Sequence, residues 1–192
     1  KLGQKVLPDM ITLVNDPLDE SFMDATAFDD EGVPTARQEE ISKGVFKSCF
    51  ANLDYAAKLG IEPTGNGFRS EMFMSGSPIR IQPTSLMKHL AFAPGKDKFG
   101  DMVGSMKRGI IVEGVIGPHS GNILNGDFSV GLSPGLLVEK GEVVGRVKEA
   151  LVSGNIYELL QNVSGIEDRV HFQDGITRNP SILVDDVKVS AN

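Results

Sequence analysis

The sequence predicts an α+β fold, strand-rich, in which a mostly antiparallel mixed sheet carries two or three short helices. The 192 residues include 22 glycines and 10 prolines, whereas aromatic residues make up only 6% of the chain. This composition favours many turns between short elements over a few long helices. No internal repeat, low-complexity tract or linker divides the chain, so we expect one domain over residues 1–192.

The N-terminal segment predicts a strand and then a loop. Residues 6–14 alternate apolar and polar positions and run into Asn15-Asp16-Pro17, the pattern of a strand followed by a turn. Residues 19–34 are rich in aspartate, glutamate and small side chains. That composition favours a solvated surface loop.

The next segment leaves its element type open. Apolar residues between Ile41 and Ala57 fit a helical spacing, but Gly44 interrupts the pattern and the segment also alternates as a strand does. Residues 54–59 predict a helical turn closed by Gly60. Residues 63–83 then contain several prolines and glycines and predict a long loop, a feature uncommon in compact domains unless it is functional.

An amphipathic helix is the clearest local prediction. Phe99, Met102, Val103 and Met106 recur at positions i, i+3, i+4 and i+7, and Gly109 follows as the expected C-terminal glycine. A second helix is predicted after Asn155, because an N-cap residue with an acidic residue three positions later is a helix start signal.

Strands are predicted in the second half of the chain. β-branched and apolar runs there are separated by glycine-rich turns, which favours antiparallel pairing. The predicted strands cover residues 110–116, 127–130, 136–139, 143–147, 182–184 and 187–189.

Charge and composition exclude several classes of function. The net charge of −7 opposes the phosphate neutralisation that nucleic-acid binding requires, so we expect no nucleic-acid partner. No apolar run approaches the ~20 residues that span a bilayer, and the first residues lack a signal-peptide core, so we expect no membrane partner. Cys49 is the only cysteine, which fits a reducing cytoplasm; its apolar surroundings predict packing in the core.

The histidines give no metal motif. His89, His119 and His171 show no i, i+4 pair with an intervening glutamate, so the helical zinc-protease signature is absent and we expect no cofactor in this chain. His119 lies in a Gly-Pro-His-Ser-Gly turn and is a candidate ligand contact, although turn histidines are commonly just exposed. The other two lie in strand-like context and are expected to be partly buried and hydrogen-bonded.

Three polar, glycine-containing segments remain as candidate sites. Asparagine and glycine tolerate positive φ, and threonine, asparagine and arginine side chains can either brace a loop or hold a peptide carbonyl. Both roles stay open. We also expect Asn66 and Arg69 to bond backbone groups from an ordered loop, with Gly65 or Gly67 at positive φ. The candidate residues are Thr64, Gly65, Asn66, Arg69, His119, Gly126, Asp127, Phe128 and Asn155.

The same segments resemble the C-terminal region of the TldD/PmbA family, called modulator of DNA gyrase. The resemblance lies in the order and spacing of landmarks along nearly the whole chain rather than in one motif. The landmarks are residues 29–34, 44–45, 57–60, 64–66, 69, 109–112, 126–131, 138–142 and 154–156.

The resemblance implies that the chain is the C-terminal part of a larger protein whose α/β N-terminal portion is absent here. In this family the TldD-like subunit carries an H-E-x-x-x-H helix and a late cysteine ligand, and it cleaves unstructured peptides. The PmbA-like subunit, also called TldE, lacks these ligands. Residues 170–175 contain no cysteine, and residues 126–129 and 153–155 are similar to the PmbA/TldE branch.

The implied function is that of a non-catalytic subunit in a zinc metalloprotease complex. Its partners would be a TldD-like protease subunit, which alone would hold zinc, and an extended peptide in the shared substrate channel. The isolated chain would expose an apolar patch or a free sheet edge and self-associate through it. A stand-alone peptide-binding or scaffold protein is the alternative. For an autonomous hydrolase the sequence shows no spaced constellation.

Overall fold

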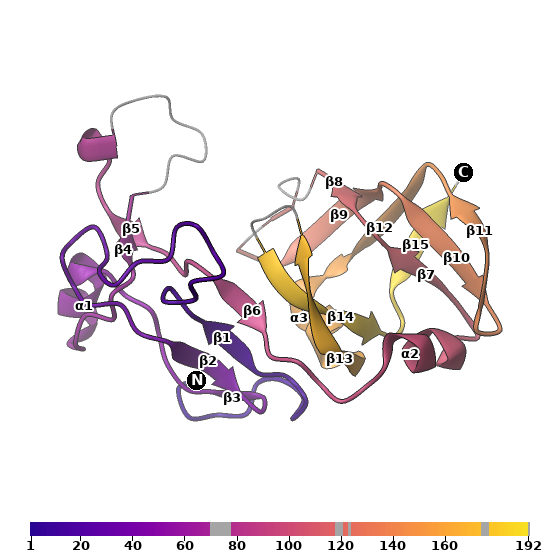
Figure 1. The fold of residues 1–192 in the computed structure, drawn as a ribbon, viewed down its shortest axis with the longest axis horizontal. Helices are drawn as coiled ribbons and strands as arrows, with labels where there is room; N and C mark the ends of the chain where they lie inside the picture. Colours follow the sequence, from indigo (N-terminus) through magenta and orange to yellow (C-terminus); the bar gives the residue numbers. More distant parts are fainter. Residues whose placement is uncertain (70–77, 118–120, 123, 174–176, 192) are drawn as a thin grey trace. The chain divides into compact units, whose positions relative to one another are not determined.

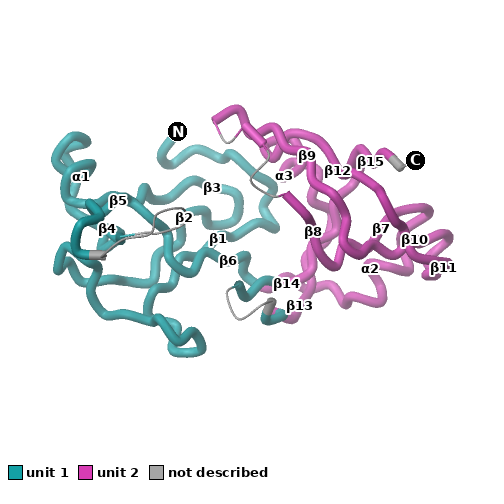
Figure 2. Tube along the Cα trace, turned by 90° about the horizontal axis from the view of Figure 1, so that it is seen from above, with its two compact units in different colours: residues 1–93, 171–179 teal, residues 94–170, 180–192 magenta. Residues whose placement is uncertain are grey.

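The chain forms two compact units in the computed structural model, which describes residues 1–69, 78–117, 121–122, 124–173 and 177–191 (Figure 1). Unit 1 comprises residues 1–93 and 171–179, and unit 2 comprises residues 94–170 and 180–192 (Figure 2). The chain therefore passes between the units three times. No linker marks this division in the sequence because two of the three passages lie inside strands.

The described part of unit 1 contains a four-stranded sheet, a two-stranded ladder, one α-helix and one 3-10 helix. Its elements are β1 (Leu13–Asn15), β2 (Gln38–Ser42), β3 (Val45–Phe46), α1 (Leu53–Leu59), β4 (Gly67–Phe68), the 3-10 helix η1 (Pro78–Arg80), β5 (Thr84–Ser85) and β6 (Leu90–Phe92).

Unit 2 contains one three-stranded sheet and one four-stranded sheet. Its elements are α2 (Phe99–Ser105), β7 (Arg108–Val112), β8 (Val115–Ile116), β9 (Asp127–Leu132), β10 (Gly135–Glu139), β11 (Glu142–Val147), β12 (Ala150–Asn155), α3 (Ile156–Gln161) and β15 (Lys188–Ala191). The paired strands β13 (Val163–Gln173) and β14 (Thr177–Val184) each contribute to both units.

The strand order in the unit 1 sheet is β3-β2-β1-β6, and each neighbouring pair is antiparallel. The sequence left open whether the segment after Ile41 forms a helix or a strand. A tight hairpin at Lys43-Gly44 joins β2 to β3, so its first part forms strands. Both residues have positive φ, 46° and 74°, as a two-residue hairpin turn requires. A side chain on Gly44 would place its Cβ 2.1 Å from the Leu7 carbonyl oxygen, so glycine is needed there.

Helix α1 begins one residue before the predicted range and ends before Gly60, as predicted. The Asn52 side chain accepts a hydrogen bond from the Tyr55 N–H at the N-terminus, and Gly60 adopts the left-handed conformation, φ 67° and ψ 35°, at the C-terminus. Cys49, expected in the core, is exposed instead. It precedes the helix in an extended stretch, so the helical spacing that placed it among apolar neighbours does not apply.

Unit 2 is built from the sheets β11-β10-β7 and β15-β12-β9-β8. Leu132, Ala150 and Val152 form a buried cluster, against which Ile110 and Phe128 pack. The predicted antiparallel, strand-rich fold with short helices is thereby confirmed. No described helix has the length and apolar character needed to cross a membrane.

Helix α2 ends earlier than predicted. Met106, the C-cap, has extended geometry, φ −72° and ψ 121°, and Gly109 lies in β7 opposite Val138. Pairing with β10 takes precedence over the glycine stop signal because a paired strand satisfies its backbone groups.

In the second half of the chain the predicted strand ranges did not include β12 and β13, and in the first half they did not include β4, β5 and β6. Ser153, Gly154 and Asn155 have the composition of a loop, but β12 pairs on both sides, with β9 and β15. In contrast, β11 lies at the end of its sheet, and its Val143 and Val144 are 51% and 54% exposed. Among the described residues β11 therefore pairs on one side only, which is the kind of sheet edge that the sequence led us to expect.

Burial predicts where truncation will cost stability. Ile11 is fully buried, whereas Ile79 is 80% exposed. We expect Ile11→Ala to lower the free energy of unfolding by about 2–5 kcal/mol, because it removes buried methyl groups and leaves a cavity. Ile79→Ala is the matched control and should change it by less than about 0.5 kcal/mol. Chemical denaturation measures both, and equal effects would contradict the assignment of Ile11 to the core.

Candidate functional site

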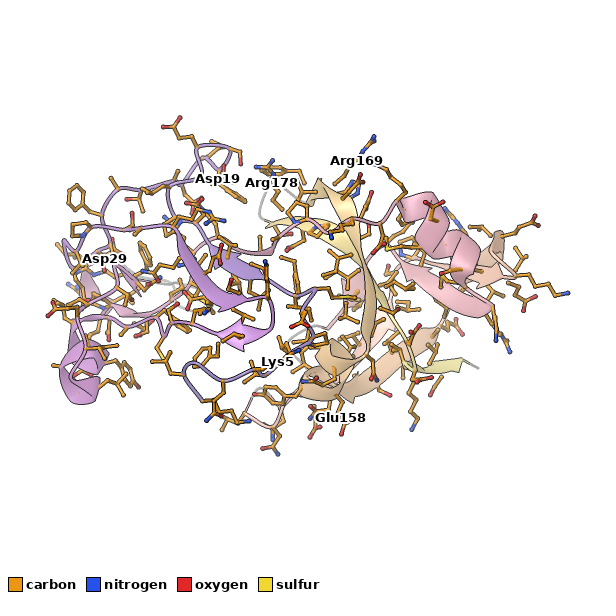
Figure 3. The ribbon with its side chains drawn as sticks, turned by 90° about the horizontal axis from the view of Figure 1, so that it is seen from below. Lys5, Asp19, Asp29, Glu158, Arg169 and Arg178 are labelled. Carbon is orange, nitrogen blue, oxygen red and sulfur yellow. The ribbon has the colours of Figure 1, made fainter. Side chains whose placement is uncertain are left out.

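Asp29, labelled in Figure 3, joins two loops of unit 1 and is only 7% exposed. Its Oδ1 accepts hydrogen bonds from the N–H groups of Glu31, at 3.0 Å, and Val33, at 2.9 Å. Its Oδ2 accepts one from Gly67 N–H at 2.8 Å. The 19–34 segment was expected to be solvated, and this expectation is wrong at Asp29: three N–H donors compensate the burial of its carboxylate.

Asp30 extends the same connection. Its N–H donates to the Gly67 carbonyl at 2.9 Å, and its Oδ2 accepts from Arg69 N–H at 2.7 Å. Together the two aspartates bond both backbone groups of Gly67 and the N–H of Arg69. The backbone from β4 to Arg69 is therefore held on this side by carboxylates and on the other by β5.

The Thr64–Arg69 segment is braced by its own side chains. Asn66 is fully buried; its Nδ2 donates to the Leu86 carbonyl at 3.1 Å, and its Oδ1 accepts from Thr64 Oγ1 at 2.7 Å. Gly65 has φ +70°, and a Cβ there would lie 2.3 Å from the Pro34 carbonyl oxygen. The expected backbone contacts and positive φ are thereby confirmed, since Arg69 Nε also donates to the Ile81 carbonyl at 2.9 Å.

A polar groove opens beside Arg69. It has a volume of about 420 Å3 and carries charges of both signs. Lys88 Nζ lies 5.2 Å from the centre of the Phe68 ring, a cation–π distance, and Phe28 is 58% exposed. The lining residues are Asp24, Thr26, Phe28, Asp30, Phe68, Arg69, Leu86 and Lys88. Donors, carboxylate acceptors and aromatic surface in one groove suit a ligand with alternating polar and apolar groups.

His89 supports one wall of the groove, because it holds Asp24. Its side chain is 4% exposed and stacks on Phe22 with ring centroids 4.0 Å apart. Nε2 lies 2.9 Å from Asp24 Oδ1, and Nδ1 lies 3.1 Å from the Asp16 carbonyl oxygen. Both ring nitrogens therefore lie within hydrogen-bond distance of an oxygen. The expected burial and hydrogen bonding of His89 are confirmed.

Electrostatics keep the Asp24 carboxylate ionised. Burial alone would raise the pKa of Asp24, but the hydrogen bond from His89 and the charge of Lys88 outweigh it and lower the pKa below its ordinary value of 3.8. Lys88 Nζ lies 3.3 Å from Asp24 Oδ2 and donates to the Asp24 carbonyl at 2.7 Å. A second pair in unit 1, Arg178 with Asp19, likewise lowers the pKa of Asp19, behind the larger effect of hydrogen bonds from Ser21 (Figure 3).

The remaining candidate residues form a structural corner in unit 2. Asn155 Nδ2 donates to the Asn125 carbonyl at 2.8 Å and to Asp127 Oδ1 at 2.9 Å, while its Oδ1 caps α3 at the Tyr157 N–H. Gly126 has φ +81°, and a Cβ there would lie 2.7 Å from the Tyr157 ring. Phe128 packs on the buried cluster of unit 2. These contacts tie β9 to β12 and α3.

The structure therefore brings the candidates together in two sets. Thr64 to Arg69 belong to unit 1, and Gly126 to Asn155 belong to unit 2, while His119 lies outside the described residues. Sequence reasoning missed Asp24 and Lys88 as lining residues of the groove. Spacing could not reveal them, because loops and strands far apart in the chain supply them.

The described residues do not offer a zinc site. No group of three or more histidine, cysteine, aspartate or glutamate side chains lies together among them. Both ring nitrogens of His89 already have partners, and His171, which was expected to be partly buried, is exposed.

Comparison with known proteins places the fold in a metallopeptidase-related class. The family described as PmbA/TldA metallopeptidase C-terminal domain matches residues 1–191. The chain belongs to this family, as its landmarks indicated.

Relatives of both branches are similar to the chain. A metalloprotease TldD homologue from Haemophilus influenzae is 29% identical over 92% of this chain and 35% of its own length. A metalloprotease PmbA homologue from the same organism is 28% identical over 100% of this chain and 38% of its length. The crystal structure of TldE from Thermococcus kodakarensis has a TM-score of 0.85 and 33% identity over 100% of this chain and 42% of that protein. The chain thus spans well under half of these proteins.

The brace around Asn66 predicts a stability effect. We expect Asn66→Ala to lower the free energy of unfolding by about 1–3 kcal/mol, because the Leu86 carbonyl loses its side-chain donor inside the protein. Asn125→Ala is the control, since that side chain is exposed, and we expect a change within about 0.5 kcal/mol. Denaturant titration compares the two; no difference between them would contradict a structural role for the Asn66 amide.

The lowered pKa of Asp24 predicts a pH dependence. A carboxyl whose folded pKa is lowered contributes stability that is present above its unfolded pKa and lost as pH falls through the folded value. The difference in unfolding free energy between the parent and Asp24→Asn should therefore shrink below pH 3.8. In a His89→Gln background the same difference should be smaller and change less with pH. A difference that stays constant from pH 7 to 2 in the parent background would refute the coupling.

Proposed function

We propose that this chain belongs to a PmbA/TldE-type subunit without catalytic zinc, which pairs with a TldD-like metallopeptidase and positions an extended peptide for cleavage. The observation that carries the proposal is the groove of unit 1, which is lined by the cations Arg69 and Lys88 together with the acidic residues Asp24 and Asp30. Peptide hydrolysis is assigned to the partner because the described residues gather no metal site.

Two further observations support the PmbA/TldE branch. The PmbA homologues match 98–100% of this chain, whereas the TldD homologues match 91–92%. Residues 170–175 also contain no cysteine, the residue that supplies a late zinc ligand in the TldD-like branch of the resemblance.

The groove offers the groups that an extended peptide requires. Arg69 uses Nε to hold the Ile81 carbonyl, which fixes the guanidinium, and its terminal nitrogens are donors suited to peptide carbonyls. The carboxylates of Asp24 and Asp30 are acceptors for peptide N–H groups. Exposed Phe28 and the edge of Leu86 provide apolar surface for side chains between these polar contacts.

Reconstitution with a TldD-like subunit from the same organism tests the proposal. We expect the two proteins to co-elute, zinc to accompany the TldD-like subunit, and the pair to cleave an unstructured peptide. Arg69→Met should raise the KM of the pair roughly tenfold and leave kcat nearly unchanged, because it removes charged donors to the peptide but no reacting group.

Lys58→Met serves as the matched control. Lys58 is an exposed cation of unit 1 that pairs with Asp54 and does not line the groove. Both variants should retain the melting temperature of the parent within a few degrees, so a change in KM reports the groove. Stoichiometric zinc in this chain alone would reject the metal-free assignment. Peptide binding that needs no partner and leads to no cleavage would instead favour the stand-alone peptide-binding protein.

A further inference from the structure

Two side-chain amides lie side by side where β1 pairs with β2. Asn15, the last residue of β1, is fully buried, and its Cα partner is Gln38, the half-buried first residue of β2. Directly opposite residues of antiparallel strands point to the same face of the sheet, with their Cβ atoms about 5 Å apart. The two amides are therefore close enough to share a partner.

Each amide has one end bonded and the other end unpaired. Asn15 Oδ1 accepts a hydrogen bond from His89 N–H at 3.3 Å, and Gln38 Nε2 donates to the Thr64 carbonyl at 2.8 Å. The opposite ends, Asn15 Nδ2 and Gln38 Oε1, are buried and have no hydrogen-bond partner among the described residues. One is a donor and the other an acceptor, and each is costly to leave unpaired inside a protein.

The bonded ends lead to two parts of the groove beside Arg69. On the Asn15 side, the ring of His89 holds Asp24. On the Gln38 side, Thr64 donates to the Asn66 amide, at the start of the segment that carries Arg69. A link between Asn15 and Gln38 would therefore complete a chain of hydrogen bonds from one side of the groove to the other.

The two unpaired atoms restrict what can join them. The donor Asn15 Nδ2 would not hold a cation, and the acceptor Gln38 Oε1 would not hold an anion, so the partner must be neutral and must both accept and donate. Both atoms are shielded from solvent, which leaves room only for a very small molecule. Water meets these conditions, and buried waters commonly bond polar groups that have no other partner.

We propose that Asn15 and Gln38 are positioning residues of the groove, joined by one buried water that accepts from Asn15 Nδ2 and donates to Gln38 Oε1. This link would add to the bonds between Asn66 and Leu86, which already tie the two parts of the groove together. The link itself is independent of the proposed function; only its effect on peptide binding rests on that function.

Nuclear magnetic resonance of the whole chain tests the water. The side-chain amide protons of Asn15 should show a nuclear Overhauser effect to a long-lived water, and Gln38→Met should abolish it because the water loses its acceptor. Gln4→Met is the matched control, since Gln4 is exposed, and it should retain the signal. A parent protein without this signal, or one in which the two amides bond each other directly, would overturn the proposal.

A double-mutant cycle tests the coupling of the two amides. Asn15→Leu and Gln38→Met should each raise the unfolding equilibrium constant about tenfold, because each leaves a buried partner unpaired. The double variant should be about tenfold less destabilised than the product of the single effects. Asn125→Leu with Gln4→Met, both at exposed positions, should show independent effects. Independent effects of Asn15→Leu and Gln38→Met would overturn the link.

The pKa of Asp24 separates positioning from simple stability. Burial alone would raise this pKa, and the hydrogen bond from His89 is the main effect that lowers it. Gln38 bonds neither residue, so a rise of the pKa toward 3.8 in Gln38→Met would report transmission through Asn15 and His89. Gln4→Met should leave the pKa unchanged. An unchanged pKa in Gln38→Met would overturn the positioning role.

Reconstitution with a TldD-like subunit links the water to peptide binding. Gln38→Met should raise the KM of the pair several-fold and leave kcat nearly unchanged, because the groove loses order and no reacting group is removed. An unchanged KM would overturn the positioning role. A parent pair that cleaves no peptide would reject the proposed function instead, and the resonance, stability and pKa measurements would still decide on the buried water.

Discussion

The carboxylate of Asp29 is the contact on which the candidate groove depends. It accepts three backbone N–H groups, two from its own loop and one from Gly67 in β4. These bonds fix the turn of the acidic loop and join it to the segment that carries Arg69. Without them the groove would lose the relative placement of its two main loops, since β4 contributes only two residues to a ladder with β5.

Charge in unit 1 is used in two distinct ways. Asp29 is buried and compensated by backbone donors, so its role is structural. Asp24 is held by His89 and Lys88 at the groove, where an ionised carboxylate also remains accessible to a ligand. The pairing of one buried and one accessible aspartate explains how an acidic loop can be ordered and still present charge.

The two sets of candidate residues differ in what their contacts leave available. In unit 2, Asn155 uses both ends of its amide to cap α3 and to hold Asp127, which accounts for these residues as structural. In unit 1, Arg69 braces the loop through Nε and also lines the groove. Loop bracing and ligand contact were both open in the sequence. The described contacts show bracing in both sets, and ligand contact in unit 1 stays a proposal.

Local patterns in the sequence determined much of this protein. The capping residues of α1 and α3, the apolar spacing of α2, most strands of unit 2 and the positive φ at Gly65 follow from interactions within a few residues. Family membership was likewise readable from the order of short landmarks.

Only the tertiary structure decided the remaining features, because these features depend on pairing between distant segments. Pairing with a strand on each side made β12 a strand despite its loop-like residues. A bulge in β2 placed the polar residue Glu40 in the lining of an apolar pocket. The N–H of Gly67 in β4, with two N–H groups of the acidic loop, compensates the burial of Asp29, which its acidic neighbours had predicted to lie in solvent.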